Sequence, residues 1–207
     1  MPPDVPRSGR SVAAQLVALI CAALTAAVLI GGWGLHIDTL VRFRPEFHAM
    51  MPATAASFMC LSVALLAVSA GSPDIRTAAR WSTILVALVA LLSLLAPFAM
   101  KVLAQDVTVA FVTKDRMSVG TSFGLILAAI CIYALLARRG ERYEYAFLGA
   151  MFGMAATLSI LFGHSFDPTS PLSVPGFAAM SVYSAIAFAL LFLAVLLECR
   201  HQDELDD

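Results

Sequence analysis

Six long stretches of the chain contain no Asp, Glu, Lys or Arg, and short polar segments separate them. A helix that crosses a bilayer needs ~20 predominantly apolar residues. Because backbone polar groups find no water inside a bilayer, a helix that pairs them internally is expected for each stretch. The pattern predicts six transmembrane helices, within Ser11–Ile37, Phe47–Pro73, Trp81–Met100, Met117–Ala137, Tyr145–Phe166 and Pro168–Leu197.

A short motif opens every second stretch. It consists of a Met, three further residues, a Thr or Ser, and then an Ala or Ser, and its Met residues are Met50, Met117 and Met180. The copies are 67 and 63 residues apart. Self-similarity at a fixed period indicates repeated structural units. We therefore expect an all-α membrane protein whose six helices form three pseudo-repeated helical hairpins, spanning approximately residues 11–71, 78–137 and 144–198 within a membrane domain of residues 11–198.

Composition supports a protein that is embedded in a membrane. The chain is 60% hydrophobic and 13% charged, and its mean hydropathy is +0.88. An average soluble domain is about 45–50% apolar and about 25% charged. The formal net charge of −1 gives no reason to expect a nucleic-acid partner, which normally needs a concentrated basic face. The lipid bilayer is the expected surrounding.

The distribution of basic residues predicts the orientation. An even number of spans places both termini on one side, and eight of the thirteen Lys and Arg residues fall on that side. Cytoplasmic loops carry the excess of Lys and Arg. Both termini are therefore expected in the cytoplasm, with residues 1–10 as an N-terminal tail and residues 199–207 as an acidic C-terminal tail.

Small and hydroxylated residues follow each motif along one helix face. Residues four and seven positions after each Met share that face, and such residues let membrane helices approach closely and hydrogen-bond. Two interpretations stay open: the faces pack the bundle, or they converge on a central, ligand-facing cavity with pseudo-threefold symmetry. The stripe consists of Met50, Thr54, Ser57, Met117, Thr121, Gly124, Met180, Ser184 and Ala187. Gly149 and Gly153 form a second candidate for close packing.

The sequence contains no recognisable catalytic set. An ionisable residue within a membrane span marks a functional site by default, and the six stretches hold no Asp, Glu, Lys or Arg. This argues against a proton relay, an ion-coupled carrier or a voltage sensor. His36, His48 and His164 are candidate ligand or metal contacts near the outer face, but they lack close ligand spacing. We expect interfacial histidines, no metal, no cofactor and no enzymatic activity.

A resemblance to a known family adds a function. The stretch from Trp33 to Leu40 reads Trp-Gly-Leu-x-Ile-Asp-x-Leu, and Met-x-Pro-x-Thr-Ala follows at Met50. With the long apolar helix after it, this pattern resembles the integral-membrane, N-terminal sensory (MASE-like) domains of bacterial histidine kinases and diguanylate cyclases. The resemblance covers roughly Gln15 to Leu197, and the later motif copies depart from it with Val119 and Val182 in place of Pro52.

The resemblance implies a non-enzymatic input module in the bacterial inner membrane. Its last helix would pass a signal to a cytoplasmic output domain. No such domain follows Leu197 in this sequence, so we expect either a fragment or a standalone relative that acts through a protein partner. The alternative is an accessory or structural subunit of a larger respiratory or photosynthetic membrane complex. A homo-oligomer is also left open, and a transporter or membrane enzyme is the least favoured class.

Overall fold

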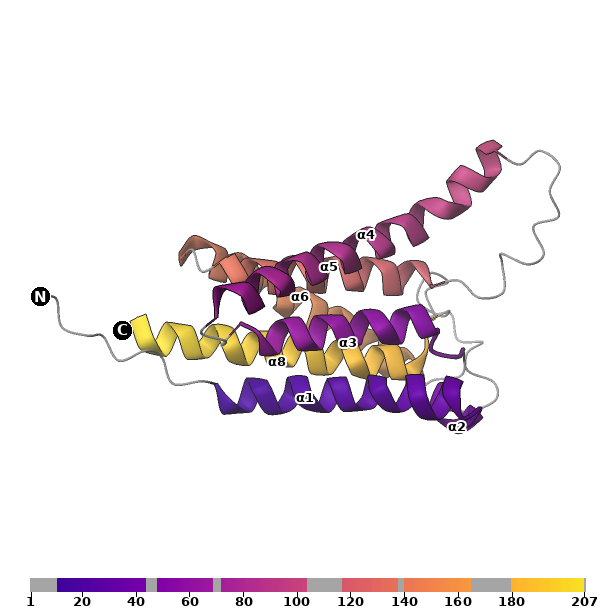
Figure 1. Ribbon diagram of the computed structural model, residues 1–207, viewed down its shortest axis with the longest axis horizontal. Helices are drawn as coiled ribbons and strands as arrows, with labels where there is room; N and C mark the ends of the chain where they lie inside the picture. Colours follow the sequence, from indigo (N-terminus) through magenta and orange to yellow (C-terminus); the bar gives the residue numbers. More distant parts are fainter. Residues whose placement is uncertain are drawn as a thin grey trace, which may run out of the picture.

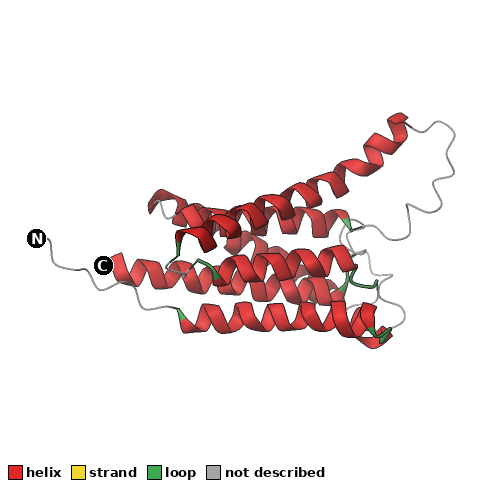
Figure 2. Ribbon diagram, in the orientation of Figure 1, coloured by secondary structure: helices red, strands yellow, loops and turns green. Residues whose placement is uncertain are grey.

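The computed structural model describes residues 11–43, 48–68, 72–103, 117–137, 140–164 and 180–206. In these ranges the chain forms helices joined by loops, and no strand occurs there (Figure 2). The elements are α1 (Val12–Ala27), the π-helical segment η1 (Val28–Gly34), α2 (Asp38–Val41), α3 (Pro52–Leu66), α4 (Pro73–Leu103), α5 (Val119–Ala137), α6 (Gly140–His164) and α8 (Val182–Asp206).

Within the part of the chain that the structure describes, five helical segments are long and apolar enough to cross a membrane. They are Val12–Gly34, Pro73–Ala96, Val119–Ala137, Tyr143–Gly163 and Val182–His201. The described part of the chain is thus helical, and the length and apolar character of these segments indicate a multi-pass membrane protein. The predicted second span gives α3, which has 15 residues and is shorter than a typical crossing helix.

The helices form an inner and an outer set. The inner helices α3, α5 and α8 contact one another. Each outer helix packs against two of them: α1 against α3 and α8, α4 against α3 and α5, and α6 against α5 and α8 (Figure 1). Each predicted hairpin thus supplies one outer and one inner helix, and the outer helix also contacts an inner helix of a different hairpin.

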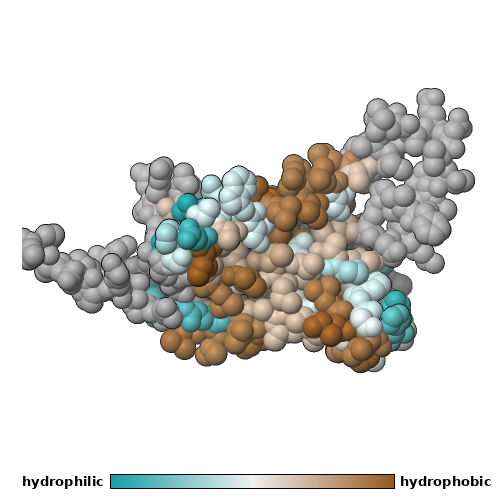
Figure 3. All heavy atoms as spheres, in the orientation of Figure 1, coloured by the Kyte–Doolittle hydropathy of each residue, from teal (hydrophilic) through white to brown (hydrophobic). Residues whose placement is uncertain are grey.

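Burial follows this arrangement. Within the spanning windows, 50% of the α5 residues and 56% of the α8 residues are buried, against 28%, 22% and 22% for α1, α4 and α6. Large hydrophobic side chains are exposed along the outer helices, and hydrophilic residues gather toward the two ends of the bundle (Figure 3). Such a belt is what the hydrocarbon of a bilayer covers.

The two ends of the bundle differ in what they contain. At one end α3, α5 and α8 begin, directly after the three Met motifs, and we call this the motif end. At the opposite end α1 begins and α8 ends, and we call this the C-terminal end (Figure 1).

The length of α3 has a local cause. Pro52 occupies its first turn, where the missing proline N–H costs nothing, and the residue before a proline avoids the helical conformation. The apolar residues Met50 and Met51 therefore form an extended entry instead of a first turn. At the other end the helix stops at Leu66, and Ala67 and Val68 form a turn.

Other helices run past the predicted apolar windows. α4 begins at Pro73, α6 begins at Gly140, and α8 continues to Asp206. The segment expected as an acidic tail, residues 199–207, is thus helical up to Asp206. Apolar windows mark where lipid surrounds a helix, whereas Arg, Gln and Glu are good helix formers in water.

Glycines bring the helices into close contact. A Cβ atom at Gly124 of α5 would lie 2.5 Å from the Phe188 ring of α8, and one at Gly153 of α6 would meet the Phe192 ring. A Cβ at Gly149 would lie 2.7 Å from the sulfur of Cys131 on α5. Gly149 and Gly153, the predicted packing pair, therefore receive side chains from two different inner helices.

Substituting Gly153 with Ala should destabilise the bundle by about 1–3 kcal/mol, because the added methyl overlaps the buried Phe192 ring. Gly163→Ala is the matched control on the same helix, since its Cβ would meet nothing within 4 Å. Unfolding in mixed detergent measures both variants. Adding Phe192→Leu to Gly153→Ala should recover part of the loss, and equal stability of the two alanine variants would contradict this packing.

Candidate functional site

The three Met motifs mark the starts of the inner helices. Met50, Met117 and Met180 lie just before α3, α5 and α8, all at the motif end. Met50 and Met180 are buried, and Met117 is partly buried. The motif therefore packs apolar side chains beneath the ends of the three central helices.

Hydroxyl groups cap two of these helices. The Ser118 Oγ accepts a hydrogen bond from the Thr121 N–H (3.1 Å) and lies 2.8 Å from the Thr121 hydroxyl. Ser181 and Ser184 repeat the same two contacts at 3.1 Å and 2.8 Å. A serine at this position satisfies one N–H that the first helical turn leaves unpaired. In the first copy no side chain caps the helix, and Pro52 removes one of the unpaired N–H groups instead.

The predicted stripe lies inside the bundle. Its hydroxyl residues and Ala187 are buried, and Gly124 is partly buried beneath the Phe188 ring. The aromatic rings of Phe58 and Phe188 meet edge to face with centroids 4.5 Å apart, and Phe188 and Phe192 stack at 5.9 Å. At Gly124 the stripe thus leaves room for the Phe188 ring of α8, which in turn meets Phe58 of α3.

A cavity of about 340 Å³ lies beside the stripe, between α5, α6 and α8. From the stripe, Gly124 and Met180 contribute to its lining. The Thr157 hydroxyl on the lining donates to the carbonyl of Gly153 at 2.7 Å, so its hydrogen atom is already used within α6. The cavity therefore presents a hydrocarbon and aromatic wall to whatever enters it.

The motif end also holds a tightly folded loop. The π-helical segment η1 ends in a turn in which His36 adopts a left-handed conformation, with φ 58°. The short helix α2 then folds back, and its Leu40 and Val41 side chains pack against Gly31 and Gly32. Glycine permits this approach because it has no Cβ atom.

Hydrogen bonds connect this loop to two inner helices. The Trp33 indole N–H donates to the Met50 carbonyl at 3.0 Å, and the Met50 N–H donates to the Val41 carbonyl at 2.9 Å. The Tyr183 hydroxyl of α8 donates to the Thr39 carbonyl at 2.7 Å. The loop is thereby attached both to the entry of α3 and to the first turn of α8.

The histidines do not form a described metal site. His36 and His48 are exposed at the motif end. His164 is the last residue of α6, and its side chain lies outside the described residues. Among the residues that the structure describes, no group of three His, Cys, Asp or Glu side chains is placed to hold a metal ion.

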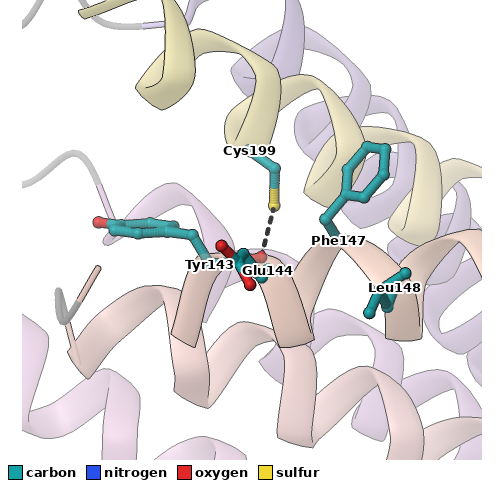
Figure 4. Close-up of a pocket in the computed structure, with 5 residues that line it drawn as sticks. All are labelled: Tyr143, Glu144, Phe147, Leu148 and Cys199. Carbon is teal, nitrogen blue, oxygen red and sulfur yellow. Dashed lines mark hydrogen bonds between the residues drawn. The ribbon is translucent and has the colours of Figure 1, made fainter. Parts of the chain in front are cut away.

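The C-terminal end has a second, smaller pocket of about 270 Å³ between α6 and α8. Tyr143, Glu144, Phe147, Leu148 and Cys199 line it, and the Cys199 thiol lies 4.0 Å from the carbonyl oxygen of Tyr143 (Figure 4). The thiol contacts the backbone across the helix interface, which is consistent with a packing role for this buried cysteine.

The sequence did not predict the positions of two polar residues at the C-terminal end. Glu198 is only 5% exposed, although it stands one residue beyond the last apolar window. The Arg80 guanidinium of α4 donates to the Leu136 carbonyl at 2.7 Å, near the end of α5. A cation near a helix C-terminus is favoured by the unpaired carbonyls there. The sequence shows only where each residue lies relative to an apolar window. That position does not reveal which face of the helix turns toward the interior of the bundle.

Removing either serine cap should lower the stability of the bundle. Ser118→Ala and Ser181→Ala each leave one N–H of the first turn without its partner, and a loss of about 1 kcal/mol is expected. Ser159→Ala is the control, because its exposed hydroxyl bonds only within α6. Equal losses for all three variants in detergent unfolding would contradict a specific role of the motif.

Replacing Trp33 with Phe should loosen the loop at the motif end. The substitution keeps an aromatic ring but removes the N–H that bonds to the Met50 carbonyl, which costs about 0.5–1.5 kcal/mol. Trp81→Phe is the matched control, since Trp81 is 67% exposed on α4. Thermal unfolding checks the difference, and equal midpoints would show that the bond contributes nothing.

Comparison with known proteins leaves the chain without an assigned relative. No family model matches the sequence, and neither a curated protein nor a solved structure matches it.

Proposed function

We propose that this protein is a non-enzymatic sensory or input module of a bacterial inner membrane. The observation that carries the proposal is the position of α8. This last helix contacts α1, α3, α5 and α6, so it is packed against both inner partners and two outer helices. A displacement of any of these neighbours is transmitted to α8 because packed interfaces adopt discrete arrangements.

The continuity of α8 supports the same role. The helix runs without a break from Val182 to Asp206 and passes from an apolar segment into a polar one. A helix of this kind carries a rotation or translation from the membrane to its polar end. That end is where a cytoplasmic output domain or a protein partner would receive the signal.

The proposal includes six crossings with both termini in the cytoplasm. α3 is short, but it lies among the inner helices and runs alongside α8 (Figure 1). The surrounding helices shield much of its surface, so a shorter apolar length suffices for it. The start of α1 and the end of α8 lie at the same end of the bundle (Figure 1), and the Lys and Arg excess assigns that end to the cytoplasm.

The resemblance to MASE-like sensory domains rests on two segments that lie together at the motif end. The two segments that carry it, around Trp33 and around Met50, are joined by the indole–carbonyl hydrogen bond at 3.0 Å. They therefore form one unit at the motif end. The Tyr183 bond to Thr39 connects this unit to α8, which gives the outer face a path to the signalling helix.

Filling the buried stripe should change signalling in a fused output domain. The combined variant Thr54→Leu, Thr121→Leu and Ser184→Leu enlarges three buried positions and forces the inner helices apart. Fusion of the chain to a diguanylate cyclase makes cyclic dinucleotide production the readout. We expect a change of about fivefold or more, the lower range of typical coupling between sites.

The control introduces leucine at exposed positions instead of buried ones. Ala56→Leu lies two residues from Thr54 on α3, and Ala155→Leu lies on α6, and both positions are exposed. Unchanged output from the buried variant, with the fusion still folded, would contradict an input role. Purification in mild detergent supplies a second check, since stoichiometric co-purifying subunits would favour an accessory subunit of a membrane complex.

A further inference from the structure

Glycines and aromatic rings meet in the lining of the cavity between α5 and α6. Gly124 and Gly153 leave room for the rings of Phe188 and Phe192, and any Cβ at these positions would collide with those rings. Both rings also line the cavity. The aromatic pair of α8 therefore forms the floor of a groove whose walls are α5 and α6.

The chemistry of the lining selects an apolar occupant. The groove is lined by hydrocarbon, glycine and aromatic groups, and the Thr157 hydroxyl is engaged with the Gly153 carbonyl. A polar ligand would lose its hydration here and find the Thr157 oxygen as the one side-chain hydroxyl acceptor on the lining, which is costly. A volume of about 340 Å³ is within the range of small-ligand sites.

The groove is continuous with the surface that faces the bilayer. Three large side chains on its lining are also exposed: Phe123 by 58%, Ile130 by 58% and Phe152 by 71%. All three lie within the membrane-spanning segments of α5 and α6. An occupant therefore enters sideways from the hydrocarbon layer.

The length of the groove matches one leaflet. On α5 it runs from Gly120, in the first turn, to Ile130. Ile130 lies ten residues after Gly120, a rise of about 15 Å, which is half of the ~30 Å hydrocarbon core. At the motif end Met180 borders it, so the groove begins where the headgroup region meets the hydrocarbon.

We propose that this groove binds one acyl chain of a phospholipid from the leaflet at the motif end. The chain lies between α5 and α6 and rests on Phe188 and Phe192 of α8. The acyl chain would be the ligand of the proposed input module. Only the effect of the chain on signalling rests on the proposed input role. Binding of the chain is measured separately and needs no output domain.

Photolabelling in vesicles tests the site directly. The protein is reconstituted into phosphatidylethanolamine and phosphatidylglycerol vesicles that contain a phosphatidylcholine with a diazirine midway along one acyl chain. After illumination, mass spectrometry maps the labelled residues. We expect label concentrated on residues 123–130 and 152–160, above the level on the bilayer-facing surfaces of α1 and α4. Even labelling of all lipid-facing surfaces would overturn the proposal.

A matched pair of variants sharpens the test. Ala156 lines the groove and Ala155 is an exposed neighbour outside it. Ala156→Phe should reduce labelling of the two segments about fivefold or more, because the new ring takes the volume that the chain occupies. Ala155→Phe should leave the labelling unchanged. Equal labelling of the two folded variants would overturn the site, whereas an unchanged cyclase output in the Ala156→Phe fusion, with its labelling reduced, would contradict only the input role.

Discussion

Close contact between glycine and aromatic rings is the interaction on which this bundle depends. Lipid chains are as apolar as leucine, so the hydrophobic effect does not drive membrane helices together, and packing must do so. At Gly124 and Gly153 the helix backbones come near enough for the Phe188 and Phe192 rings to fill the remaining space. These contacts fix the positions of α5 and α6 around α8. The groove lies beside these contacts and is lined by the same two rings.

The inner and outer sets of helices have different surroundings. α1, α4 and α6 present apolar surface to lipid, while α3, α5 and α8 pack mainly against protein. A central helix has neighbours on every side, so its position depends on the positions of all the helices around it. α8 is such a helix, and it also extends beyond the apolar region to Asp206. The proposed input role rests on this combination.

The sequence predicted the coarse architecture well because apolar length and residue size are local properties. The apolar windows located the main helices, and the Met motifs coincided with the starts of α3, α5 and α8. The shortness of α3 was not predicted, because Pro52 prevents the helix from starting earlier in the apolar window. The helical end of α8 was not predicted, because hydropathy does not detect helices in water. The packing of α2 on Gly31 and Gly32 depends on the left-handed turn at His36, and the groove at Gly124 depends on contacts between helices far apart in the sequence. Periodicity reveals neither.

The serine caps have a mechanical consequence. The hydroxyls of Ser118 and Ser181 are satisfied within their own helical turns, so these ends of α5 and α8 can shift without stranding a polar group in an apolar setting. The entry to α3 is instead bonded to the adjoining loop through both the N–H and the carbonyl of Met50. The exposed Tyr183 bond of α8 can exchange with water at little net cost. A shift of the start of α3 therefore breaks both Met50 backbone bonds. A shift of the start of α8 breaks the exposed Tyr183 bond and the weak, buried bond from the Cys21 thiol to the Ala187 carbonyl at 3.5 Å.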